Sequence, residues 1–191
     1  PKPSSAASDV YKRQLHIHTN PDRFVVGTIG EPGQRVFFLQ ARSGKRLTSV
    51  SLEKQQVAAL AQRLDILLDE VERMDLAEVG DSSLPDDLDP LETPIDDEFR
   101  VGALSLGWDE DERLVLIEAF AQTEDESDEP YDDDDAAGPD LLRVRLTPLE
   151  GRAFVRRATV VVGAGRPACP FCSLPLDREG HVCPRSNGYR R

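Results

Sequence analysis

Hydrophobic positions along the chain follow the alternating pattern of strands and then the three-to-four-residue spacing of a helix. Residues 23–29 and 34–41 are runs of β-branched and aromatic residues separated by turn residues, which predicts a hairpin. A third strand is expected near 46–50, and a helix from about 52 to 74. The apolar face of that helix recurs at helical spacing and consists of Val57, Leu60, Leu64, Leu67, Val71 and Met74.

The second half of the chain repeats this order of elements. Strands are expected near 99–107, 113–121 and 141–146. A helix then begins at Thr147, where Thr147 serves as the N-cap, Pro148 takes the first helical position and Glu150 completes a capping box. The helix is expected to end before Gly163.

Three short matches occur in the same order in both halves, which indicates an internal duplication. They pair Phe24–Ile29 with Phe99–Leu104, Arg35–Ala41 with Arg113–Ala119, and Leu52–Glu53 with Leu149–Glu150. Short connections favour antiparallel strands, and the helices need a sheet face on which to bury their apolar sides. The sequence therefore predicts an α+β fold of two tandem βββα pseudo-repeats. One six-stranded sheet and two packed three-stranded sheets both fit this pattern.

The three cysteines of the chain lie within a short C-terminal segment. Cys169 and Cys172 are followed, after eight residues, by His181 and Cys183, which gives the spacing C-x2-C-x8-H-x-C. Three thiolates and one imidazole form a tetrahedral ligand set that is typical of structural zinc. We therefore expect a small zinc-ribbon-like module with one structural Zn2+ bound by these four residues.

A redox function is the alternative for the Cys-Pro-Phe-Cys motif. That chemistry needs the first cysteine at the N-terminus of a helix, where the helix dipole lowers the thiol pKa. Pro175 follows closely and opposes a helix, and no βαβ pattern surrounds the motif. The spacing of His181 and Cys183 also favours zinc.

Charge is distributed very unevenly along the chain of 191 residues. The net charge is −13, but residues 75–140 hold 25 acidic and two basic residues, whereas residues 143–191 hold ten arginines and three acidic residues. The acidic run within 123–139 is expected to be a disordered, solvated loop. A decoy for a basic partner or for the chain's own Arg-rich C-terminal arm is a weaker alternative for it, and a calcium-binding loop is weaker still.

The beginning of the chain has an unusual sequence. Asp9–Gln14 matches an in-frame translation of a transposon-end sequencing adapter, so residues 1–21 are assigned to an artefactual or disordered tail. His16 and His18 would share one face of an extended segment, but no neighbouring donors complete a metal site. No apolar run is long enough to span a membrane and no signal peptide is evident, so we expect a cytoplasmic protein.

Two segments resemble an uncharacterised family of proteins of about 190 residues, known mainly from actinobacteria and catalogued as a domain of unknown function. They are Pro21–Arg35 together with Leu52–Gln56, and the tail from Cys169 through Gly180-His181-Val182-Cys183-Pro184-Arg185 to Tyr189. The resemblance implies no established activity.

These features divide the chain into five segments. They are the tail 1–21, a first repeat 22–79, an acidic Pro-rich loop 80–98, a second repeat 99–165 with its acidic insert 123–139, and the zinc-ribbon-like tail 166–191.

The sequence favours a non-enzymatic adaptor that binds another protein. No catalytic constellation or cofactor-binding motif is visible, and the oligomeric state is left open. Nucleic-acid binding through Arg166, Arg178, Arg185, Arg190 and Arg191 is an alternative, disfavoured because the acidic segment repels phosphate. An enzyme with a pocket between the repeats is a further alternative.

Overall fold

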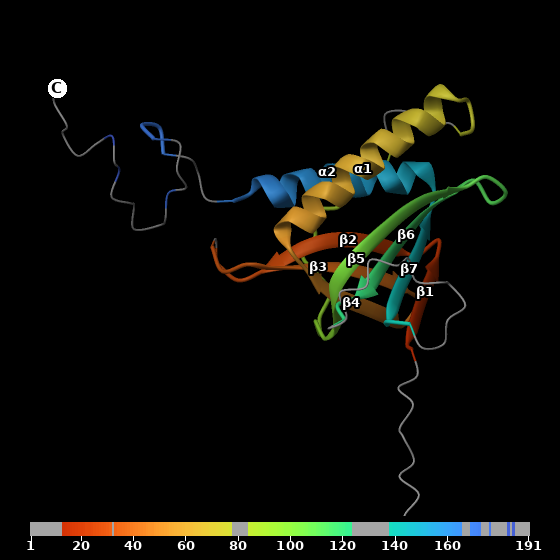
Figure 1. The fold of residues 1–191 in the computed structure, drawn as a ribbon, viewed down its shortest axis with the longest axis horizontal. Coiled ribbons are helices and arrows are strands. Elements are labelled where there is room, and N and C mark those ends of the chain that lie inside the picture. Colours follow the sequence, from red (N-terminus) through yellow and green to blue (C-terminus); the bar gives the residue numbers. More distant parts are fainter. Residues whose placement is uncertain are drawn as a thin grey trace, which may run out of the picture.

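The computed structural model describes residues 13–31, 33–77, 84–123, 138–165, 169–172, 176, 183 and 185. Within this part of the chain, seven strands and two helices form a mixed α+β fold, which confirms the predicted class (Figure 1). The elements are β1 (Leu15–Thr19), β2 (Arg23–Ile29), β3 (Val36–Ser43), β4 (Arg46–Leu52), α1 (Lys54–Arg73), β5 (Asp97–Asp109), β6 (Leu114–Ala121), β7 (Leu141–Leu146) and α2 (Pro148–Gly163).

All seven strands belong to a single sheet in the order β1-β7-β6-β5-β4-β3-β2. The strands β2, β3 and β4 form one antiparallel meander, and β5, β6 and β7 form another. The two meanders join through the parallel pair β4–β5, and β1 adds to β7 in parallel. Of the two arrangements left open by the sequence, the single sheet is therefore correct, and it has one strand more than expected.

Both helices lie on the same face of the curved sheet and pack against each other (Figure 1). The buried side of α1 consists of Val57, Leu60, Ala61, Leu64, Leu68 and Val71. The sequence analysis assigned Leu67 and Met74 to this side. Leu68 is fully buried in place of Leu67, which is only partly buried, and Met74 is 64% exposed because it is the C-cap residue beyond the last turn. The sheet contributes the other half of the core.

Part of the expected tail 1–21 belongs to the folded sheet, so this assignment is wrong for that part. Its residues 15–19 form β1, and the backbone N–H of Leu141 donates to the carbonyl oxygen of Gln14 at 2.9 Å. His18 is completely buried, and its two ring nitrogens lie 2.8 Å from Ser43 Oγ and 3.0 Å from Thr48 Oγ1. Three strands separate β1 from β4 in the sheet, so this contact shows how strongly the sheet curls around its core.

The predicted matches between the two halves occupy comparable positions in two cases of three. Phe24 and Phe99 lie near the starts of β2 and β5, and Arg35 and Arg113 immediately precede β3 and β6. The third match is shifted, because Leu52–Glu53 precedes α1 whereas Leu149–Glu150 lies inside α2. The N-cap residues of the helices are Glu53 and Thr147, and in both helices the residue three positions later accepts a hydrogen bond from the N-cap backbone. Duplication itself stays a prediction.

Two acidic segments interrupt the regular elements. Most of the insert 123–139 lies outside the described residues, whereas Gly138, Pro139 and Asp140 are buried next to β7. Residues 84–96, which we call the strap, lie between α1 and β5 in the chain. The strap contains no helix or strand and crosses the sheet. Leu91 of the strap packs onto Gly27 of β2 so closely that a Cβ on Gly27 would lie 2.6 Å from Leu91 Cγ.

Candidate functional site

The structure brings the three cysteines together, as the motif predicted. The sulfur atoms of Cys169, Cys172 and Cys183 all lie within 4.8 Å of one another. Cys169 and Cys183 are buried, and Cys172 is half-buried. In the described part of the chain, this is the one group of three or more histidine, cysteine or carboxylate side chains that is close enough to hold a metal ion.

The spacing of two of the sulfur atoms fits neighbouring corners of a tetrahedral metal centre. Cys169 Sγ and Cys183 Sγ are 3.8 Å apart. Two thiolates at the usual zinc–sulfur distance of about 2.3 Å, at neighbouring corners of a tetrahedron, are separated by about 3.8 Å. A disulfide would require about 2.05 Å. The pair is therefore spaced as two ligands of one metal ion rather than as two halves of a disulfide.

The fourth predicted ligand, His181, lies outside the described residues, so its participation stays a prediction. The other described residues of the tail show how the two cysteine segments are connected. Residues 170–172 form a turn, and Arg185 Nη1 donates to the carbonyl oxygen of Phe171 at 3.3 Å. This hydrogen bond links the segment containing Cys183 to the turn that contains Cys172.

The local structure of the tail does not favour the redox alternative. A thioredoxin-like cysteine requires a helix that begins at the first thiol. Within the described residues, Cys169 is followed by a turn at 170–172 and not by a helix. The Phe171 side chain at this turn is 63% exposed, which leaves a large aromatic ring on the surface beside the cysteine cluster.

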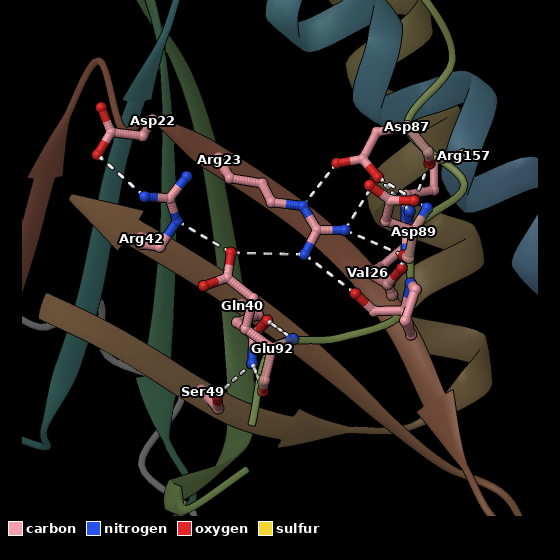
Figure 2. Close-up of polar contacts among 11 residues, drawn as sticks. Asp22, Arg23, Val26, Gln40, Arg42, Ser49, Asp87, Asp89, Glu92 and Arg157 are labelled. Carbon is pink, nitrogen blue, oxygen red and sulfur yellow. Dashed lines mark hydrogen bonds and ion pairs between the residues drawn. The ribbon is translucent and has the colours of Figure 1, made fainter. Parts of the chain in front are cut away.

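A second polar cluster, which the sequence analysis missed, fastens the strap to the sheet (Figure 2). Arg23 of β2 binds the carboxylate of Asp87 through Nε (2.6 Å) and Nη2 (2.9 Å). Arg157 of α2 is 8% exposed, and its Nη1 lies 3.0 Å from the Oδ1 atom of the same carboxylate. One carboxylate of the strap therefore joins a strand and a helix.

The backbone of the strap is held by the same two guanidinium groups. Arg23 donates to the carbonyl oxygens of Asp89 and Pro90 at 3.0 and 3.1 Å. Arg157 donates to the carbonyl oxygens of Asp87 and Asp89, the latter at 2.7 Å. The strap lacks a strand partner over this stretch, so these donors satisfy carbonyl groups that would otherwise need water.

Further along the strap, Gln40 of β3 takes the place of a strand partner (Figure 2). Its amide nitrogen donates to the carbonyl oxygen of Glu92 at 3.0 Å, and its amide oxygen accepts from the Glu92 backbone N–H at 2.8 Å. The Gln40 side chain is almost fully buried, and it also donates to Ser49 Oγ at 3.1 Å. Arg42 Nε donates to the Glu92 carboxylate at 2.9 Å.

The electrostatics of this cluster favour a structural role. The hydrogen bond from Arg23, followed by the positive charges of Arg23 and Arg157, lowers the pKa of Asp87 despite its partial burial. The same hydrogen bond raises the pKa of Arg23, whereas desolvation lowers the pKa of Arg157. A carboxyl group with a lowered pKa stays ionised at neutral pH and is unsuited to act as an acid catalyst.

The two N-terminal histidines are not arranged as a metal site. Both ring nitrogens of His18 are hydrogen-bonded to Ser43 and Thr48, and the ring of His16 lies 6.3 Å from the ring of Phe99.

Of the arginines predicted to bind nucleic acid, only Arg185 falls within the described residues, and it is exposed. Neither helix of the described part is both long enough and apolar enough to cross a membrane.

Comparison with known proteins identifies the family. The chain belongs to the family described as "Protein of unknown function (DUF3090)", whose sequence pattern matches residues 16–183. The match spans six complete strands and all but the first residue of β1, both helices and all three cysteines. A search of curated proteins gave no match, and a search of solved structures gave none either. The match begins inside β1, in agreement with the inclusion of this strand in the fold.

Proposed function

We propose that this protein binds one structural zinc ion through Cys169, Cys172, His181 and Cys183. The observation that supports this most directly is the 3.8 Å separation between Cys169 Sγ and Cys183 Sγ, which matches two corners of a zinc tetrahedron. Four protein ligands would leave no coordination position for water or substrate, so the ion would have a structural rather than a catalytic role.

The zinc-bound tail would serve as a docking element for another protein, in a non-enzymatic adaptor of the cytoplasm. Zinc binding supplies folding free energy to a segment that is too short for a core of its own. The exposed ring of Phe171 offers the kind of aromatic anchor that dominates protein interfaces. The hydrogen bond from Arg185 to the Phe171 carbonyl would hold the backbone of the turn that carries this ring.

Zinc stoichiometry and partner binding can be tested separately. Native mass spectrometry of the full chain should show one zinc per chain, and the Cys172→Ser variant should lose it. The Phe171→Ala variant should retain zinc, because its backbone carbonyl and the ligands are unchanged, but should fail to bind the partner of the wild-type chain. Loss of zinc in Phe171→Ala, or retention of the partner, would contradict the assignment of Phe171 as the anchor.

Nucleic-acid binding is the second candidate function, because Arg185 and Phe171 are both exposed and lie close together, with Arg185 Nη1 donating to the backbone carbonyl of Phe171. Arginine with an aromatic ring can hold a phosphate and stack on a base. Such binding would weaken steeply with salt, with a log–log slope near −0.7 for each phosphate contacted on a single strand. Absence of DNA and RNA binding at low salt, also after deletion of 124–135, would eliminate this candidate.

We also infer that the two βββα halves arose by duplication. The order of elements is the same in both, and the two helices begin with the same backbone-to-side-chain hydrogen bond. A single rotation should superpose Phe24 on Phe99, Arg35 on Arg113 and the N-cap Glu53 on Thr147. If no single rotation brings these pairs together, the similarity of the halves is compositional.

A further inference from the structure

The three thiols of the cysteine cluster differ in how far solvent can reach them. Cys169 and Cys183 are buried, with 4% and 7% of their surface exposed, whereas Cys172 is half-buried. Cys172 lies in the turn at 170–172, next to the exposed Phe171. Oxidation of a cysteine follows its exposure and its thiolate character, so Cys172 is the thiol of this cluster that a dissolved oxidant reaches first.

The proximity of the sulfur atoms supplies a partner for an oxidised Cys172. All three sulfur atoms lie within 4.8 Å of one another, so a second thiolate can reach Cys172 after a small movement. A cysteine that binds a metal ion is deprotonated, and the thiolate is the form that reacts. An accessible thiolate beside a second cysteine is the arrangement that makes a cysteine pair sensitive to oxidants.

Cys169 is the better-placed partner for Cys172. The two residues are separated by two positions in one short segment, whereas Cys183 lies further along the chain, and a shorter loop costs less entropy to close. The segment of Cys183 is joined to the turn by the hydrogen bond from Arg185 Nη1 to the Phe171 carbonyl oxygen, whose length of 3.3 Å is beyond the usual range. Cys169 would therefore stay near Cys172 when the metal ion leaves.

We propose that hydroperoxides release zinc from this protein by oxidising Cys172 and Cys169 to a disulfide, an inference that rests on the proposed zinc site. The Cys172 thiolate attacks a peroxide oxygen, the O–O bond breaks, and the sulfur becomes a sulfenic acid while hydroxide or alkoxide leaves. The Cys169 thiolate then attacks this sulfur, the S–O bond breaks, and a hydroxide leaves. The two thiolates thereby lose two electrons, and the hydroperoxide is reduced to water, or to water and an alcohol, once the leaving groups are protonated.

Oxidation would dismantle the docking element. A disulfide sulfur is no longer a thiolate ligand, so His181 and Cys183 would be the remaining donors of the proposed set, fewer than a structural zinc site needs. Without the ion, the segment of Cys183 would separate from the turn, and the Phe171 carbonyl would lose its hydrogen bond from Arg185. Partner binding through Phe171 would then respond to the oxidant. This role differs from thioredoxin-like catalysis, because it requires no helix at the first thiol.

Transfer of zinc from the full chain to a colorimetric chelator, with and without hydrogen peroxide, tests this inference. The zinc content of the reduced chain is measured first. We expect peroxide to accelerate the transfer at least about tenfold, with a Cys169–Cys172 disulfide and a free Cys183 thiol in the peptide map. A thiol reductant and added zinc should restore the starting state. A reduced chain without zinc contradicts the proposed zinc site itself, whereas a chain that holds zinc equally long with and without peroxide overturns only the redox inference.

Two matched ligand replacements test which cysteines are oxidised. Histidine can take the place of a cysteine in structural zinc sites, because Cys3His and Cys2His2 ligand sets both occur. Cys172→His removes the accessible thiolate, whereas Cys183→His keeps both members of the pair. Under peroxide, Cys172→His should therefore release zinc at least about tenfold more slowly than Cys183→His. Equal rates in the two variants would contradict the assignment. If either variant binds no zinc, the peptide map of the oxidised wild-type chain decides, and a disulfide that includes Cys183 would overturn the proposal.

Discussion

Arg157 Nε donates a hydrogen bond of 2.7 Å to the backbone carbonyl of Val26 in β2, which is an edge strand of the sheet. The residue thereby satisfies an edge carbonyl that would otherwise be available to another chain. Arg46 forms the equivalent contact at the opposite end of the sheet, where it donates to the carbonyl oxygen of Ile17 in β1. An arginine therefore covers part of each edge strand.

Replacement of Arg157 should destabilise the fold strongly. In Arg157→Leu the Val26 carbonyl, the strap carbonyls and the Asp87 carboxylate all lose a buried donor, so we expect a loss of about 2–4 kcal/mol in the free energy of unfolding. Urea denaturation measures this loss. The matched control is Arg156→Leu, because Arg156 is partly exposed and its partner Asp86 is exposed. That loss should stay below about 1 kcal/mol, and equal losses in the two variants would contradict the role of Arg157.

Stability should fall in mildly acidic solution because of His18. Burial, followed by the positive charges of Arg46 and His16, lowers the pKa of His18 from 6.5 to about 4. The unfolded chain therefore binds a proton at a higher pH than the folded chain does. The stabilising contribution is complete above pH 6.5 and is lost as the pH falls through 6.5 towards 4, with a total of about 3 kcal/mol.

The pH dependence of urea denaturation, compared with that of His18→Gln, isolates this contribution. The variant should be less stable at neutral pH and should lack the decline between pH 6.5 and 4. Below that window, protonation of Asp87, whose pKa is lowered in the folded state, should add a second decline in both proteins. A wild-type chain as stable at pH 4.5 as at pH 7 would show that the folded state accommodates a charged His18.

Two glycines of β5 should respond differently to alanine. A Cβ on Gly102 would lie 2.8 Å from the Gln122 Cα, and a backbone atom cannot move aside easily. Gly102→Ala should therefore cost about 1–3 kcal/mol. A Cβ on Gly107 would meet its nearest neighbour at 3.9 Å, so Gly107→Ala should be neutral or slightly stabilising. Thermal denaturation of both variants tests this contrast, which equal melting temperatures would refute.

Most of the strands and both helices could be predicted from sequence because their patterns are local. The first strand was missed because the adapter-like sequence at Asp9–Gln14 led to the assignment of residues 1–21 to a tail. Its residues do alternate, with His16 and His18 facing the core and Leu15 and Ile17 exposed. The error between Leu67 and Leu68 has a different origin, since both lie at helical spacing from Leu64 and only packing distinguishes them.

The two polar clusters differ in how visible they are in the sequence. The cysteines could be predicted to meet because ligands of a small metal module lie close together in the chain. The contacts of the strap with the sheet could not be predicted, because its acidic, proline-rich composition is the same as that of a solvated loop. Its partners Arg23 and Arg157 are 64 and 70 residues away from Asp87, so no local pattern connects them.

X-ray absorption at the zinc edge of the purified full chain tests the central proposal most directly. We predict three sulfur neighbours at about 2.3 Å and one nitrogen neighbour at about 2.0–2.1 Å, from Cys169, Cys172, Cys183 and His181. In His181→Ala the outer-shell scattering of the imidazole ring should disappear while the three sulfur neighbours remain, because water can take the fourth position. A chain that binds no zinc, or a zinc ion without the three sulfur neighbours, would contradict the proposal.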